Sequence, residues 1–181
     1  MARVPYLDPE DLAAEDRELL ARPISLFRVL SHSPGGARAF QGMGGWIRFK
    51  CTLDPRLREL AILQVGYLAR SPYEWSHHVK IGYDFGVSDA DIEALIAETE
   101  GRGSDLPELD RTVLKGAREM TAEGAMSKAT FDALHAEFGH QGMVDLCIVI
   151  AFYNAVVRFL GSMEMDVEAD YQPYLDKYPL P

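Results

Sequence analysis

The sequence predicts an all-α protein, with a single domain over residues 1–181 and eight or nine helices around a central helical hairpin. Three observations lead to this prediction. Apolar residues recur at helical spacing in several long segments. Asp-Pro and Ser-Pro pairs, which are typical of helix starts, precede several of these segments. No segment shows sustained alternation of apolar and polar residues or an Asn-Gly or Asp-Gly hairpin turn, so no strand is expected.

The first fifty residues are expected to form three helices after an extended arm at residues 1–7. An Asp-Pro pair at residue 8 predicts a helix that runs to about Ala21, with Asp8 as its N-cap. A short apolar helix follows at residues 24–32, and a glycine-rich helix at residues 35–49. Glycine lowers helix propensity, so its repeated use in the last helix suggests close packing against a neighbour or a ligand.

Residues 56–86 form the predicted hairpin, on which the interpretation of the whole chain depends. An Asp-Pro pair at residue 54 starts its first helix, and a Ser-Pro pair at residue 71 starts its second. Gly86 is expected to end the second helix as its C′ residue. No other part of the sequence holds so many groups able to transfer a proton: Glu59, Glu74, His77 and His78.

The second half of the chain is expected to add four helices and a tail. The helices are predicted at residues 88–100, 106–122, 127–138 and 141–163. Gly139 should break the pattern between the last two. The helix at 141–163 is the most apolar, so we expect it to be the central one. The tail after residue 169 is rich in aromatic residues and proline, and we expect it to lie extended over its own or a neighbouring subunit.

Composition and charge exclude several classes of partner. The formal net charge is −10, from 18 basic and 28 acidic residues, so a nucleic acid or an anionic membrane surface is not expected as a partner. A small anionic substrate needs only one or two local cations and stays compatible. The longest apolar run, residues 143–160, is interrupted by Asp145, Asn154 and Arg158, which argues against a membrane span. No signal peptide is recognisable, so a cytoplasmic protein with reduced thiols is expected.

Glu74 and His78 are the central candidates for acid–base chemistry. They are four residues apart and therefore share one face of a helix. A carboxylate beside an imidazole raises the pKa of the imidazole and fixes its tautomer. Ser71 and Glu74 also fit an S-x-x-E capping box, in which Glu74 only reaches back to the backbone, and both interpretations stay open. Glu59, on the first helix of the hairpin, can face His78, or it can form a surface ion pair with Arg56 or Arg58.

The remaining polar groups are assigned by position. His77 points about 100° away from His78 on a helix, so we expect it outside the pocket, solvated or at a subunit contact. An HExxH spacing is absent, and we expect no metal and no cofactor. Asn154 and Arg158 can share a face and bind a substrate carboxylate, or be satisfied within the core or an interface. Core or interface packing is the commoner outcome for Trp75. The candidate substrate-binding residues are Ser71, Tyr73, Trp75, Asn154 and Arg158.

The hairpin sequence RELAILQVGYLARSPYEWSHHVKIGYDFGVSD resembles the carboxymuconolactone decarboxylase / alkylhydroperoxidase D-like (AhpD-like) superfamily, most strongly over residues 54–96. The resemblance implies an all-helical protein that assembles as a trimer or hexamer. The peroxidase branch has a glutamate, a CxxC pair and a histidine at these positions. Glu59 and His78 fit the glutamate and the histidine, but Ser71 and Glu74 stand at the two cysteine positions.

The missing cysteines decide between the two branches of this superfamily. Cys51 and Cys147 cannot replace the pair by spacing, and a disulfide-cycling peroxidase needs a thiolate and a resolving thiol. The decarboxylase branch has Glu-x-x-x-His without cysteines, which Glu74 and His78 match. The resemblance therefore favours a cysteine-less variant that uses acid–base chemistry.

We expect a cofactor-independent lyase or isomerase acting on a small carboxylated or lactone-like intermediate of aromatic-compound catabolism. His78 would be the general acid/base, and Glu74 and Glu59 would orient it or relay protons. The alternatives are an AhpD-like peroxidase or antioxidant (peroxiredoxin-type) activity, and a non-catalytic helical oligomer that binds a small molecule. The glycine-rich helix, the aromatic tail and an exposed Trp75 are taken to indicate a homo-oligomer.

Overall fold

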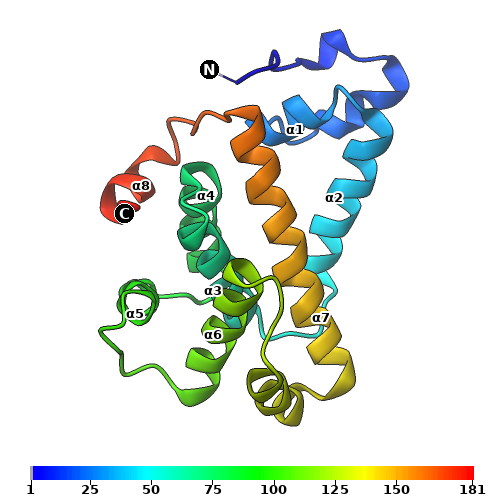
Figure 1. Cartoon of the computed structure of the whole chain (residues 1–181). Coiled ribbons are helices and arrows are strands. Elements are labelled where there is room, and N and C mark those ends of the chain that lie inside the picture. Colours follow the sequence, from blue (N-terminus) through cyan, green and yellow to red (C-terminus); the bar gives the residue numbers. More distant parts are fainter. Residues whose placement is uncertain (1) are drawn as a thin grey trace.

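The computed structural model describes residues 2–181, and within this range it contains helices and no strand, as predicted. Eight α-helices are present in these residues, or nine if the longest is divided at its break, together with two short 3-10 helices (Figure 1). In chain order they are η1 (Pro9–Asp11), η2 (Ala14–Leu20), α1 (Ser25–Leu30), α2 (Pro34–Phe49), α3 (Pro55–Leu68), α4 (Pro72–Asp84), α5 (Asp89–Thr99), α6 (Glu108–Ala122), α7 (Lys128–Met163) and α8 (Gln172–Lys177).

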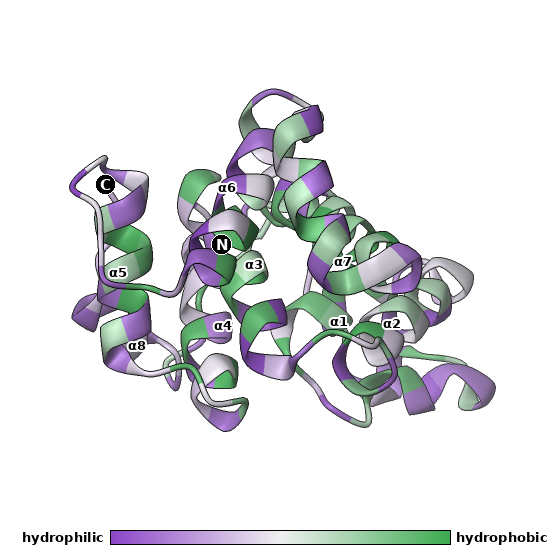
Figure 2. Ribbon diagram, turned by 90° about the horizontal axis from the view of Figure 1, so that it is seen from below, coloured by the Kyte–Doolittle hydropathy of each residue, from purple (hydrophilic) through white to green (hydrophobic). Residues whose placement is uncertain are grey.

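Helix α3 is the centre of the fold, and α3 and α4 form the predicted hairpin. Eleven consecutive residues of α3, from Leu57 to Tyr67, are buried, because α4, α6 and α7 all pack against it. A helix that is covered on all sides has to be apolar all round or have its polar groups paired. The expectation that residues 141–163 form the central helix is therefore wrong. Figure 2 shows apolar turns on the inner helices and hydrophilic turns at the periphery.

Helix α7 is the longest helix and crosses the whole molecule (Figure 1). The predicted break at Gly139 is confirmed, since its φ of 63° and ψ of −171° are a conformation that glycine adopts without strain. Within residues 2–181, α7 alone is long and apolar enough to cross a bilayer. Half of its most apolar stretch is buried against the rest of the protein, which is typical of a core helix.

The N-terminal segment differs from its prediction. Residues 8–21 do not form one α-helix but the two 3-10 helices η1 and η2. The predicted start is present, because Asp8 and Asp11 form a reciprocal capping box. The chain is then extended at Leu12 and Ala13, which places the Leu12 side chain in the core and prevents the helix from continuing.

The C-terminal tail folds back over its own chain and covers Trp75. Residues 172–177 form α8 rather than an extended segment, and α8 packs against α4. Trp75 is completely buried, and its Nε1 donates a hydrogen bond to the Tyr178 carbonyl oxygen at 2.7 Å. Its ring packs against Tyr67, with ring centroids 5.3 Å apart. The expectation of an exposed Trp75 is therefore wrong, and this residue gives no support to a subunit contact.

We predict that Trp75→Phe lowers the free energy of unfolding by about 2–3 kcal/mol, because it leaves a cavity and removes the donor to the Tyr178 carbonyl. The measurement is urea unfolding followed by circular dichroism. Trp46→Phe is the matched control, since Trp46 is only partly buried on α2, and it should cost about 1 kcal/mol or less. Equal losses in the two variants would contradict the role given to the Trp75 hydrogen bond.

Candidate active site

The hairpin brings Glu59 of α3 together with Glu74 and His78 of α4. His78 Nδ1 donates a hydrogen bond to Glu59 Oε2 at 2.7 Å. His78 Nε2 lies 3.0 Å from Glu74 Oε1. All three side chains are at least nine-tenths buried. The imidazole is thus held between two carboxylates, one on each side of its ring.

Arg58 completes this arrangement, although its role could not be read from the sequence. Its Nε and Nη2 atoms donate to Glu59 Oε1 at 3.2 and 3.0 Å, and its Nη1 donates to the Arg48 carbonyl oxygen at 3.0 Å. The guanidinium also lies 4.5 Å from the centre of the Phe85 ring. Glu59 therefore accepts hydrogen bonds from a buried arginine at one oxygen and from His78 at the other, and it is not part of a surface ion pair.

Glu74 does not cap its helix, so the capping-box interpretation is wrong. The Ser71 side chain makes no capping hydrogen bond, and the Glu74 carboxylate is directed to His78 instead. Although Glu74 Oε1 is close to His78 Nε2, the two are not aligned for a hydrogen bond, and this oxygen has no hydrogen-bond partner in residues 2–181. A buried carboxylate oxygen without a partner is costly, which makes it a candidate to accept a hydrogen bond from a ligand.

The electrostatics favour a charged imidazole. Burial alone would lower the pKa of His78, but the negative charges of Glu74 and Glu59 raise that pKa to about 9. Burial alone would raise the pKa of Glu59, but His78 and Arg58 outweigh it and hold the pKa below its ordinary value. At neutral pH, His78 is therefore protonated on both nitrogens. Because Nδ1 is committed to Glu59, Nε2 is the atom that can exchange a proton.

A cavity of about 400 Å³ adjoins this cluster, a size suited to a small-molecule ligand. Glu74 and His78 form part of its wall, and most of the remaining lining is apolar. Tyr153 of α7 also lines the cavity, and its ring packs edge-on against His78 with centroids 4.9 Å apart. Burial, together with Glu74 and Glu59, raises the pKa of Tyr153 well above its ordinary value, so its hydroxyl stays protonated.

His77 also lines the cavity, contrary to the expectation that it is solvated or at a subunit contact. Its Nε2 donates to Glu168 Oε2 at 2.7 Å, and its ring is stacked between Tyr73 and Tyr171. Burial lowers the pKa of His77 in spite of Glu168. Hydrogen bonds from His77 and from the Ser25 amide bring the pKa of Glu168 to about 2, although burial opposes this. The two adjacent histidines thus differ in charge at neutral pH.

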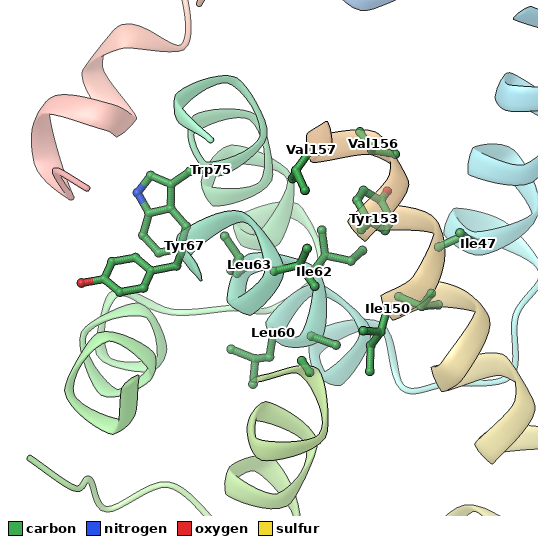
Figure 3. Packing of buried hydrophobic residues seen from close by; sticks show 14 of the residues in the cluster. Ile47, Leu60, Ile62, Leu63, Tyr67, Trp75, Ile150, Tyr153, Val156 and Val157 are labelled. Atoms are coloured by element: carbon green, nitrogen blue, oxygen red, sulfur yellow. The ribbon is translucent and has the colours of Figure 1, made fainter. Parts of the chain in front are cut away.

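The predicted substrate-binding residues separate into two groups. Tyr73 lines the cavity, and its hydroxyl donates to Glu168 Oε1 at 3.0 Å. Ser71 and Trp75 do not line the cavity, and Figure 3 shows Trp75 far from Tyr153, beside Tyr67. Asn154 and Arg158 also lie outside the cavity lining. They pair with each other, since Arg158 Nη1 donates to Asn154 Oδ1 at 2.8 Å.

The positions of Asn154 and Arg158 on α7 explain why neither side chain reaches the cavity. Asn154 also donates to Thr121 of α6, so it faces away from the side of α7 that carries Tyr153. Arg158 is exposed to solvent. A substrate-binding role for Asn154 and Arg158 is not supported by these positions. The other expectation, that a carboxylate in the core or an interface satisfies them, is not observed either, because the two side chains pair with each other.

No group of three or more His, Cys, Asp or Glu residues within residues 2–181 is arranged to hold a metal ion. The two cysteines are free and lie apart from the cluster described above. Cys51 Sγ donates to the Ile47 carbonyl oxygen, and Cys147 lies in a separate apolar groove with Met143 and His140. Burial raises the pKa of the Cys147 thiol, which reduces its thiolate fraction.

Comparison with known proteins identifies the same region. The model of the carboxymuconolactone decarboxylase family matches residues 34–103, which contain α2 to α5 with Glu59, Glu74 and His78. The resemblance recognised from the hairpin sequence is thereby confirmed over these residues. Among curated proteins, none matches this chain.

Solved structures of AhpD-like proteins share the fold over nearly the whole chain. A variant of the debrominase Bmp8, in complex with 2,3,4-tribromopyrrole, superposes with a TM-score of 0.78, 22% identity and coverage of 97% of this chain and 96% of that one. An uncharacterised peroxidase-related protein with an AhpD core, from Ralstonia eutropha JMP134, superposes with a TM-score of 0.76 and 21% identity. The superposition covers 96% of this chain and 95% of that one. A peroxidase-related protein from Silicibacter sp. TM1040 superposes with a TM-score of 0.70 and 18% identity, and the superposition covers 93% of this chain and 92% of that one. At these identities the likeness establishes the fold alone.

We predict that Glu59→Gln lowers the pKa of His78 from its value of about 9, because burial then acts with one carboxylate fewer to oppose it. The measurement is an NMR titration of the histidine ring nitrogens. Glu93→Gln, an exposed carboxylate on α5, is the control and should leave the titration unchanged. An unchanged pKa in Glu59→Gln would contradict the electrostatic account.

The same shift predicts how stability depends on pH. The pKa of His78 is higher in the folded state than in the unfolded chain, so its stabilising contribution is complete below about pH 6.5 and is lost as the pH rises through 9. The free energy of unfolding should therefore fall between about pH 6.5 and 9. His78→Gln should flatten this decline, measured by urea unfolding at several pH values, and an unchanged slope would contradict it.

Proposed function

We propose that this chain, whose residues 34–103 match the carboxymuconolactone decarboxylase family and whose fold is AhpD-like, is a cofactor-independent lyase or isomerase. The observation that carries the proposal is the His78 ring, held between Glu59 and Glu74 at the wall of a largely apolar cavity. An imidazole with one fixed and one working nitrogen can deliver a proton to a bound substrate.

The reaction we propose begins with a small carboxylated or lactone-like substrate in the cavity. In a decarboxylation, the bond to the leaving carboxylate breaks, its electron pair passes into the substrate's conjugated carbonyl, and CO2 leaves. His78 Nε2 then transfers its proton to the carbon that lost the carboxylate, and the imidazole regains a proton from solvent. Glu59 and Arg58 keep Nδ1 protonated throughout, so proton transfer is confined to Nε2.

An isomerisation would use the same groups. Glu74 Oε1 lacks a hydrogen-bond partner among the described residues, so it can take a proton from one substrate atom while His78 Nε2 gives a proton to another. The Tyr153 hydroxyl, kept protonated by its high pKa, can donate a hydrogen bond to a carbonyl or enolate oxygen. The aromatic and aliphatic side chains of the cavity wall lower the local dielectric, which strengthens each of these interactions.

Two observations weigh against the alternatives. A thiol peroxidase needs a cysteine at the cavity, and neither Cys51 nor Cys147 is among the lining residues. A vestigial site would leave His78 facing solvent with Glu74 as a helix cap, and neither is observed.

Assembly as a homo-oligomer and a cytoplasmic location stay predictions. Trp75 is not available for a subunit contact, because the C-terminal tail of the same chain covers it. Large apolar side chains that are exposed on the single chain would be covered in an oligomer, and they are Met43, Phe49, Phe131 and Val144. Light scattering at micromolar concentration measures the mass of the assembly, and a monomeric mass would refute the predicted homo-oligomer.

We predict that His78→Gln lowers turnover by about 100-fold or more, because proton transfer by a positioned side chain contributes this much. Carboxymuconolactone is the first substrate to test, and release of CO2 is the measurement. In D2O, the product should carry one deuterium at the carbon that lost the carboxylate. Glu74→Gln should also reduce turnover strongly.

The controls address the alternatives. His140→Gln changes an exposed histidine of α7 and should leave turnover unchanged. Cys51→Ser and Cys147→Ser should also retain it. Full activity in His78→Gln, or peroxide reduction with a dithiol that either cysteine variant abolishes, would overturn the proposed function.

A further inference from the structure

We propose that Arg48 is the anion-binding residue of the cavity, and that the ligand is a small, flat, largely apolar molecule with at least one carboxylate. This inference rests on the proposed function, since it assigns the substrate class of the same site. It also gives a role to the glycine-rich helix α2, which the acid–base cluster does not use.

Arg48 lies in the last turn of α2, half-buried, and lines the cavity. Its backbone carbonyl accepts the hydrogen bond from Arg58, so this turn is tied to the buried charge network. Its guanidinium forms no hydrogen bond or ion pair in residues 2–181, and its one ring contact there is to the neighbouring Phe49, at 5.9 Å. Five donors in a planar fork match a carboxylate, and here they are available.

The acid–base cluster is balanced within itself and does not neutralise Arg48, and Arg22 adds a second positive charge to the cavity lining. His78 and Arg58 are positive, and Glu59 and Glu74 balance them. The charges of Glu74 and Glu59 raise the pKa of Tyr153, whereas those of Arg48 and Arg58 lower it. The charge of Arg48 therefore reaches the part of the cavity that Tyr153 lines. A bound carboxylate would neutralise the Arg48 charge, which no side chain in the described part of the protein compensates.

Arg22 also lines the cavity but is a weaker candidate for the same role. Its side chain is exposed to solvent, and its Nη2 is 3.4 Å from the Tyr171 hydroxyl, at the limit of a hydrogen bond. A solvent-exposed cation contributes less binding energy than a half-buried one, because water screens it.

Helix α2 presents a continuous stripe to the cavity. The stripe begins at Gln41 and continues three, four and seven residues later with Gly44, Gly45 and Arg48. Residues at this spacing share one face of a helix. A Cβ atom at Gly44 or Gly45 would meet nothing within 4 Å, so these glycines leave room for a ligand and are not needed for packing within the chain. The glycines widen the cavity next to the arginine.

The rest of the wall selects the body of the ligand. Aromatic rings from four helices, α1, α2, α4 and α7, line the cavity, and those of Phe40 and Phe152 are 4.9 Å apart. A wall of this kind favours a planar apolar ring. A monocyclic carboxylate fits both the volume of about 400 Å³ and the unpaired guanidinium of Arg48.

The test compares benzoate with benzamide, a neutral probe of nearly the same shape, by NMR chemical-shift titration of the full chain. The protein should bind benzoate at least about tenfold more tightly than benzamide, because a charge-assisted bidentate pair forms with Arg48. Arg48→Gln should abolish this preference. Arg158→Gln, which removes an exposed arginine outside the cavity, should retain it, and Gly45→Leu should weaken both probes by filling the cavity.

Three results would overturn the proposal: no benzoate binding, no preference for benzoate over benzamide, or a preference that survives Arg48→Gln. Loss of the preference in Arg22→Gln with retention in Arg48→Gln would assign the role to Arg22 and likewise overturn it. Circular dichroism and thermal unfolding confirm that each variant is folded.

The outcome is separable from that of the proposed function. If His78→Gln keeps full turnover while Arg48→Gln loses the benzoate preference, the acid–base function is wrong and the anion site stands. If Arg48→Gln keeps the preference while His78→Gln loses turnover, the reverse holds.

Discussion

The buried carboxylate of Glu59 is the interaction on which the site depends. It lies on α3, which α4, α5, α6 and α7 all contact, and an unpaired charge there would be severely destabilising. Arg58 and His78 satisfy its two oxygens, so the imidazole is fixed to the core rather than to a loop. The demand that a core charge be paired therefore also sets the position, tautomer and charge of the catalytic candidate.

This constraint explains why two adjacent histidines differ. His78 lies between two carboxylates and is held positive, whereas His77 has one carboxylate partner and stacks between two tyrosine rings. Burial favours the neutral form of both, and the number of neighbouring charges decides between them. Sequence adjacency alone places them about 100° apart on α4, and the structure brings both to one cavity without making them equivalent.

The sequence predicted those parts of the site that depend on local periodicity. The spacing of Glu59, Glu74 and His78 follows from two helices joined by a short turn, and their convergence could be expected from that alone. Tyr153 and Arg48 could not be assigned, because only the tertiary arrangement of α7 and α2 brings them to the cavity. Trp75 and the tail were misjudged for a similar reason, since nothing local shows that Tyr178 returns to the indole.

The charge state of His78 also bears on which chemistry this fold can support here. A thiol at residue 74 would need a neutral imidazole to remove its proton, whereas Glu74 needs none and instead adds a second negative charge beside the ring. That charge helps to raise the pKa of His78 to about 9, so the ring is protonated at neutral pH and can act as an acid. An acid facing an apolar cavity suits a substrate that develops negative charge on carbon or oxygen. An arginine in the wall of the same cavity suits one that also carries a carboxylate.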